Sequence, residues 1–233
     1  MMNITSLLTM FLLTFALSCG LGGCSDDATD GSGTSNGQTS NNTSNGQTSN
    51  STNNSTTFVE GDTDLVDYSC NDPNWTAGEA STTMVDEPEC TSAQHVPEPV
   101  EIPYTDTPPA CGPHRPQWGV WGEYTFLPPQ RFLHNLEHGG IALLYHPCAD
   151  TTLVDALRAY AQARQADDGG DFRWVLTPYP ELPTAFAALA WGHRYMANTF
   201  DEGAVEAFVT DHYRNAPEDV RSDGGYDRLW LGR

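Results

Sequence analysis

Residues 25–57 form a tract of serine, threonine, asparagine and glycine with almost no apolar side chains. The eight residues that begin at Thr34 are repeated from Thr43. Such a segment has too little apolar surface to offset the conformational entropy lost on folding. We therefore assign residues 24–59 to a disordered tether, which limits a folded domain to the chain that follows.

The first residues of the chain have the features of a bacterial export signal. The apolar run from Leu7 to Leu17 has eleven residues, too few for a helix that crosses a hydrocarbon core of about 30 Å. The sequence Leu-Gly-Gly-Cys at 21–24 resembles a lipoprotein cleavage site, although the usual basic start is absent. We predict a lipoprotein signal peptide at 1–23 and lipidation of Cys24, with plain secretion as the alternative. The lipid would anchor the exported protein to a membrane of the cell envelope, on its periplasmic or cell-surface face.

The chain is strongly acidic. It has 31 acidic and 10 basic residues, all of them arginine, and a formal net charge of -21. This charge argues against nucleic acid as a partner. Between Glu60 and Asp106 there are 12 acidic residues and no arginine. We predict that residues 60–106 form an extended arm on a globular domain at 107–233. A protein partner in the cell envelope is a further expectation, which composition does not identify.

Four cysteines follow the tether, namely Cys70, Cys90, Cys111 and Cys148. An even number in an exported chain predicts two disulfides, for which three pairings exist. We favour Cys70–Cys90, within the arm, and Cys111–Cys148, which flanks the histidine motif described below. The chain has no Cys-x-x-Cys motif, which argues against a thiol–disulfide oxidoreductase.

Periodicity after Pro109 predicts a layered domain. Apolar runs at 140–145, 172–177 and 185–191 indicate buried strands, and residues 193–196 indicate a short return strand. Apolar residues recur at helical spacing after Thr152, in a predicted helix that Gly169 and Gly170 end. They recur at the same spacing after Asp201, which predicts a second helix. The order predicts a small α/β or α+β fold in which two helices pack on a mixed sheet, compatible with a thioredoxin-like order.

The motif His134-x-x-Glu137-His138 carries the clearest chemical signal. If a helix begins at Pro129 and ends at Gly139, His134 and His138 lie on one face, in the i, i+4 spacing that offers two imidazoles to one metal ion. His114, in a Gly-Pro-His turn, provides a third imidazole. We predict a copper or zinc site formed by these three histidines.

Further residues are candidates for the same site. Glu137 can orient an imidazole, and His193 or Met196 can complete the ligand set, with the thioether favouring copper(I). We expect His95, on the acidic arm, to be a solvent-exposed residue. The sequence assigns no catalytic residue, so an enzyme is not favoured.

Two alternatives remain open. In the first, the histidines form a structural polar network in a domain that binds a protein or a glycan through a groove lined by Trp118, Trp121 and Tyr124. In the second, the motif is that of an inverted zinc peptidase, with Glu202 as the third ligand.

Four ordered blocks of the sequence resemble the bacterial and archaeal family called domain of unknown function 3105. These blocks are Pro108–His114, Leu133–Gly140, Ala190–Gly192 and Phe200–Glu202, with Pro217–Glu218 after them. The resemblance covers roughly Tyr104 to Glu218.

The resemblance implies that the Gly-Pro-His and His-x-x-Glu-His blocks belong to one domain and converge in space. It also implies an exported or membrane-tethered protein. The chain departs from the family pattern at Cys111, where serine or threonine is usual, which favours the disulfide with Cys148. A second departure is His193, where arginine often follows Ala-Trp-Gly.

Overall fold

The computed structural model describes residues 63–84, 90 and 92–233. The predicted signal peptide at 1–23, the lipidated Cys24 and the tether at 24–59 lie outside the described residues. Within the described ranges, none of the helices has the length and apolar character of a membrane span.

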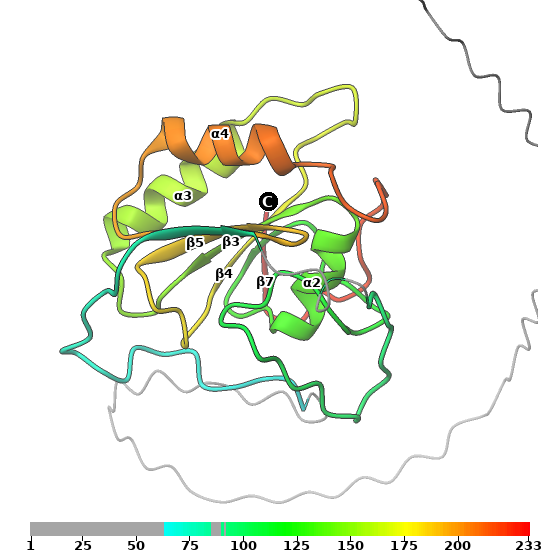
Figure 1. Ribbon diagram of the computed structural model, residues 1–233, viewed down its shortest axis with the longest axis horizontal. Coiled ribbons are helices and arrows are strands. Elements are labelled where there is room, and N and C mark those ends of the chain that lie inside the picture. Colours follow the sequence, from blue (N-terminus) through cyan, green and yellow to red (C-terminus); the bar gives the residue numbers. More distant parts are fainter. Residues whose placement is uncertain (1–62, 85–89, 91) are drawn as a thin grey trace, which may run out of the picture. The chain divides into compact units, whose positions relative to one another are not determined.

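The domain is built on a mixed sheet (Figure 1). Its strands are β1 (Ser81–Met84), β2 (Gly122–Tyr124), β3 (Ile141–Tyr145), β4 (Trp174–Pro178), β5 (Phe186–Ala190), β6 (His193–Ala197) and β7 (Trp230–Gly232). The strand order is β1-β6-β5-β3-β4-β2-β7. The strands β2, β4 and β3 are parallel, whereas β5, β6 and the two edge strands pair antiparallel to their neighbours.

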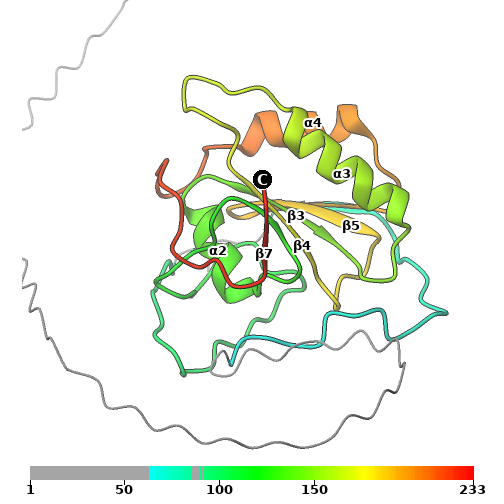
Figure 2. The same cartoon turned by 180° about the vertical axis from the view of Figure 1, so that it is seen from behind.

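Helices cover both faces of this sheet. Helices α3 (Thr151–Ala163) and α4 (Glu202–His212) lie on one face, and α2 (Pro129–Glu137) lies on the other (Figures 1 and 2). Each face has its own apolar core, because successive side chains of a strand point to opposite sides. In β3, for example, Ala142 belongs to the core on the α2 side, while its neighbour Leu143 belongs to the core beneath α3 and α4.

The predicted α+β fold is confirmed. The five central strands and three helices follow the order β2-α2-β3-α3-β4-β5-β6-α4, which is compatible with a thioredoxin-like order. Strands β1, β2 and β7 were not predicted, since they have only three or four residues each and too little alternation to give a signal. The prediction that α3 continues to Gly169 is wrong. It ends at Ala163, because Arg164 is extended and its guanidinium packs over Phe172 and Tyr213.

The predicted disulfide pairing is also wrong. The bonds are Cys70–Cys148 and Cys90–Cys111. Each joins the arm to the domain, whereas the prediction placed one bond inside the arm. Sequence separation could not reveal this, because the arm folds back along the domain and brings distant cysteines together.

A buried ion pair also attaches the arm. The guanidinium of Arg115 donates to both carboxylate oxygens of Asp64, at 2.7 and 2.6 Å. Its Nη1 donates to the carbonyl oxygens of Val96, Pro97 and Val100. Both charged side chains are almost completely buried. Loss of Arg115 would leave the buried carboxylate of Asp64 and three carbonyl groups without these hydrogen bonds.

We therefore expect Arg115→Met to lower the free energy of unfolding by roughly 3–5 kcal/mol, the usual cost of breaking a buried ion pair on one side. Urea denaturation followed by circular dichroism measures this change. The control is Asp155→Asn, which removes an exposed ion pair with Arg158 and should cost less than about 1 kcal/mol. Equal effects of the two substitutions would contradict the prediction.

Candidate metal centre

Helix α2 buries several polar side chains, which is unusual for residues of this kind, and three of them gather at its C-terminal end. His134 and Glu137 lie in its last turn, and His138 is the residue that caps it. The helix begins with Pro129 at its first position and ends because Gly139 has a positive φ of 80°. The next residue, Gly140, packs against Trp121 so closely that a Cβ would lie 2.4 Å from the ring.

His114 faces α2 from the loop that follows Cys111. Its side chain is fully buried. Its Nδ1 lies 2.8 Å from the carbonyl oxygen of Gly112, and its Nε2 lies 2.9 Å from Oε2 of Glu137. The predicted convergence of the Gly-Pro-His and His-x-x-Glu-His blocks therefore holds for His114 and Glu137.

His95 joins the same cluster from the arm. Its backbone forms a parallel bridge with that of His114, with Val96 N–H donating to the His114 carbonyl and His114 N–H donating to Gln94. Its ring stacks on that of His134, with centroids 4.5 Å apart. The side chain is 48% exposed, so the cluster is open to solvent at this point. The expectation that His95 is solvent-exposed is confirmed, but the sequence did not predict its place in the cluster, which arises because this segment pairs with the Gly-Pro-His loop.

Four donor groups consequently meet. One ligand atom each of His95, His114, His134 and Glu137 lies within 4.8 Å of every other. Oε2 of Glu137 is 3.6 Å from Nε2 of His95 and 3.7 Å from Nε2 of His134. Imidazole nitrogens and a carboxylate oxygen are common ligands of zinc and copper.

Backbone carbonyls fix the two buried imidazoles of His114 and His134. Nδ1 of His134 lies 2.7 Å from the carbonyl oxygen of Arg115, just as Nδ1 of His114 lies beside that of Gly112. A carbonyl oxygen only accepts, so each Nδ1 carries a proton and each Nε2 is left to face the cluster. Metal-binding histidines are usually oriented in this way.

His138 is adjacent to this group. Its Nε2 lies 3.1 Å from Nε2 of His134 and 3.1 Å from Oε2 of Glu218. Its ring contacts Trp118 edge to face, and its Nδ1 has no hydrogen-bond partner among the described residues. Trp118 is held there by its neighbour Gly119, whose N–H and carbonyl both bond the side chain of Asn135.

Electrostatics favour the protonation states that bind a cation. Burial lowers the pKa of His134 to about 4. The hydrogen bond with the Arg115 carbonyl raises this pKa, but the nearby imidazoles lower it further. Burial also lowers the pKa of His138. Burial alone would raise the pKa of Glu137, but the hydrogen bond with His114 and the adjacent imidazoles outweigh it and lower the pKa. At neutral pH His134 is therefore neutral and Glu137 is an anion.

The other candidate ligands lie elsewhere. His193 stacks on His212 of α4, with ring centroids 3.9 Å apart, on the opposite face of the sheet from α2. Met196 packs against the apolar core beneath α2. Glu202 is exposed at the start of α4, so it does not provide the third ligand of an inverted zinc peptidase.

The proposed aromatic groove is wrong as well. Trp121 and Tyr124 are buried in the core of the α2 face, and Trp118 packs on His134 and His138. These aromatic residues build the domain and the wall of the histidine cluster.

The fold and the cluster define a single α+β domain with converging histidine and glutamate side chains. The family model described as "Protein of unknown function (DUF3105)" matches residues 95–225. The chain belongs to this family, and the match includes every histidine and glutamate of the cluster. No curated protein and no solved structure matched the chain.

The low pKa of His134 predicts a pH dependence of stability in the metal-free protein. The pKa of His134 is 6.5 in the unfolded chain, the ordinary value for histidine, and about 4 in the folded protein. Between these two pH values the unfolded state binds more protons at this residue than the folded state, so stability is lost as the pH falls through this window. We expect this residue to account for about 3 kcal/mol of the loss. Urea denaturation at several pH values in the presence of a chelator measures it. In His134→Gln the decline should be smaller by that amount, and an unchanged decline would contradict the prediction.

Proposed function

We propose that this domain binds a transition metal ion, zinc or copper, through His95, His114, His134 and Glu137. The observation that carries the proposal is the convergence of four donor atoms within 4.8 Å. The carbonyl groups that fix Nδ1 of His114 and His134 support it. A structural polar network is the competing interpretation, in which Glu137 alone satisfies the imidazoles.

The donor set bears on the choice of metal. Three imidazoles and a carboxylate suit zinc(II) and copper(II), whereas copper(I) prefers sulfur ligands. The half-exposed His95 gives an ion access to the site from solvent. Binding would also displace the proton that lies between Nε2 of His114 and Glu137, because both atoms would become ligands.

We further propose that the protein is an exported lipoprotein held in the cell envelope through Cys24. The two disulfides support an oxidising compartment, since such bonds are rare in the reducing cytosol. A tether at 24–59 would let the domain reach metal ions or a protein partner near the membrane surface.

The metal site is tested on the full chain, purified in detergent, stripped with a chelator and then dialysed against zinc(II) or copper(II). Elemental analysis should find at least one equivalent in the parent and none in His114→Ala/His134→Ala, which lacks both fixed imidazoles. The matched control is His193→Ala/His212→Ala, which removes the histidine pair on the other face and should retain the metal. Saturating metal should also stabilise the parent by about 2.7 kcal/mol at a hundredfold excess over Kd. A parent that retains no metal would leave the structural network as the explanation.

The anchor is tested by Cys24→Ser in a bacterial host. The parent should incorporate labelled palmitate and sediment with membranes, because a lipid on Cys24 anchors the chain. The variant should lose the label. The control Cys19→Ser, which changes the other cysteine of the leader, should keep it. Labelling of the Cys24→Ser protein would exclude Cys24 as the lipidated residue.

A further inference from the structure

His138 and Glu218 are not needed for the four-ligand site, yet they lie directly beside it. With them, four imidazoles and two carboxylates are gathered at the end of α2. A zinc ion in a protein usually takes four ligands, and a catalytic zinc ion takes three and a water molecule. Six donor groups are therefore more than one such ion requires.

The six groups can be assigned to two sets of three, each with two imidazoles and one carboxylate. In the inner triad, Oε2 of Glu137 lies 2.9 Å from Nε2 of His114 and 3.6 Å from Nε2 of His95. In the outer triad, Nε2 of His138 lies 3.1 Å from both Nε2 of His134 and Oε2 of Glu218. The two triads approach each other at His134 and Glu137, where the distance is 3.7 Å. Ligands bound at about 2.0–2.2 Å to one ion lie roughly 3 to 3.5 Å apart, which the distances from Oε2 of Glu137 in the inner triad and from Nε2 of His138 in the outer triad nearly satisfy.

Hydrogen bonding alone does not satisfy the outer triad. Nδ1 of His134 faces the carbonyl oxygen of Arg115, so the lone pair of its Nε2 faces Nε2 of His138. The carboxylate oxygen Oε2 of Glu218 also offers lone pairs to Nε2 of His138. A single proton on Nε2 of His138 cannot serve both acceptors fully. A cation between the three atoms would accept a lone pair from each of them at once.

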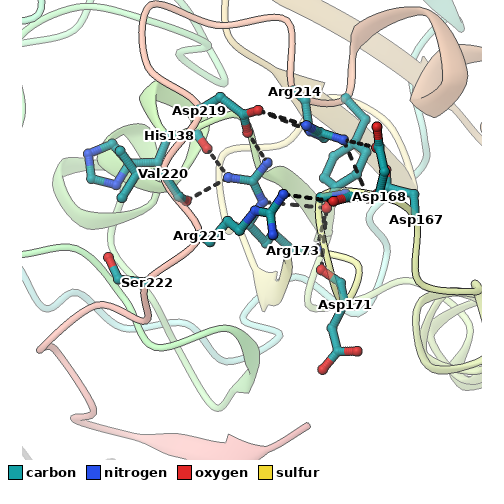
Figure 3. A network of polar contacts seen from close by, with 12 residues as sticks. His138, Asp167, Asp168, Asp171, Arg173, Arg214, Asp219, Val220, Arg221 and Ser222 are labelled. Carbon is teal, nitrogen blue, oxygen red and sulfur yellow. Dashed lines mark hydrogen bonds and ion pairs between the residues drawn. The ribbon is translucent and has the colours of Figure 1, made fainter.

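The polar contacts in Figure 3 hold the segment that follows Glu218 in place. Arg173 donates to the carbonyl oxygens of His138 and Val220 and pairs with Asp219. Arg214 pairs with the other oxygen of Asp219, at 3.0 Å, and with Asp168. The segment that carries Glu218 is thus anchored at Asp219 by two guanidinium groups.

Backbone contacts complete this anchor. The N–H of Glu218 donates to the carbonyl oxygen of Glu137, at 3.0 Å, and the N–H of Arg214 donates to that of Gly139, at 2.9 Å. The side chain of Glu218 is 54% exposed, so these backbone contacts rather than burial hold it beside His138. Its position is therefore set by the end of α2 together with the two arginines.

We propose that His134, His138 and Glu218 bind a second divalent transition metal ion beside an ion held by His95, His114 and Glu137. This inference rests on the proposed function and divides its ligands between two ions. Each ion would have two imidazoles and one carboxylate from the protein and would keep positions for water, as in two-metal centres.

The test is the stoichiometry of the full chain, saturated with zinc(II) and measured by elemental analysis. The parent should bind two equivalents. Glu218→Gln keeps the size of the side chain but weakens its binding to a cation, and should bind one. The control Glu202→Gln, an exposed glutamate on the other face, should bind two. Circular dichroism confirms that the variants are folded.

Loading with copper(II) gives a second measurement. Two neighbouring copper(II) ions should couple and weaken the electron paramagnetic resonance signal per ion, and Glu218→Gln should restore the signal of an isolated ion. One equivalent in both the parent and Glu218→Gln would overturn the second site but keep the proposed function. Complete loss of metal in Glu218→Gln would place a single ion at the outer triad and also overturn the inference. No metal in the parent would overturn the proposed function itself.

Discussion

Arg115 connects three parts of the chain that are far apart in sequence. Its guanidinium binds Asp64 and the carbonyl groups that follow His95, which attaches the arm. Its own carbonyl oxygen accepts the Nδ1 proton of His134, and its N–H donates to Gln130 in α2. The same residue therefore fixes a helix histidine and the segment that carries His95. A buried charge of this kind requires complete pairing, and the pairing here brings the ligands together.

The Cys90–Cys111 disulfide also attaches the arm to the domain close to the histidine cluster. It links the segment just before His95 to the loop that leads to His114, and the backbone bridge between the two histidines continues this link. The acidic arm is thus part of the candidate metal centre, although composition predicts only a covering segment. The family match starts at residue 95, so it includes the part of the arm that carries His95.

The C-terminal segment encloses the site in a comparable way. Arg173 and Arg214 pair with Asp219, and this leaves the adjacent Glu218 free to contact His138. The chain has a formal net charge of -21, and Arg115, Arg173 and Arg214 fix acidic residues near the site through ion pairs. The result is a site in which carboxylates from two segments face imidazoles from three.

The sequence by itself determined the α+β class, the helix that carries His134, Glu137 and His138, and the family. These depend on local periodicity, on helix capping and on ordered motifs, which short stretches of chain contain. Only the tertiary structure decided the disulfide pairing, the inclusion of His95 and Glu218, and the exclusion of His193, Met196 and Glu202. Those outcomes depend on which face of the sheet a side chain meets and on how the arm folds back. Such long-range contacts are set by packing and by buried charge pairs, so no local pattern predicts them.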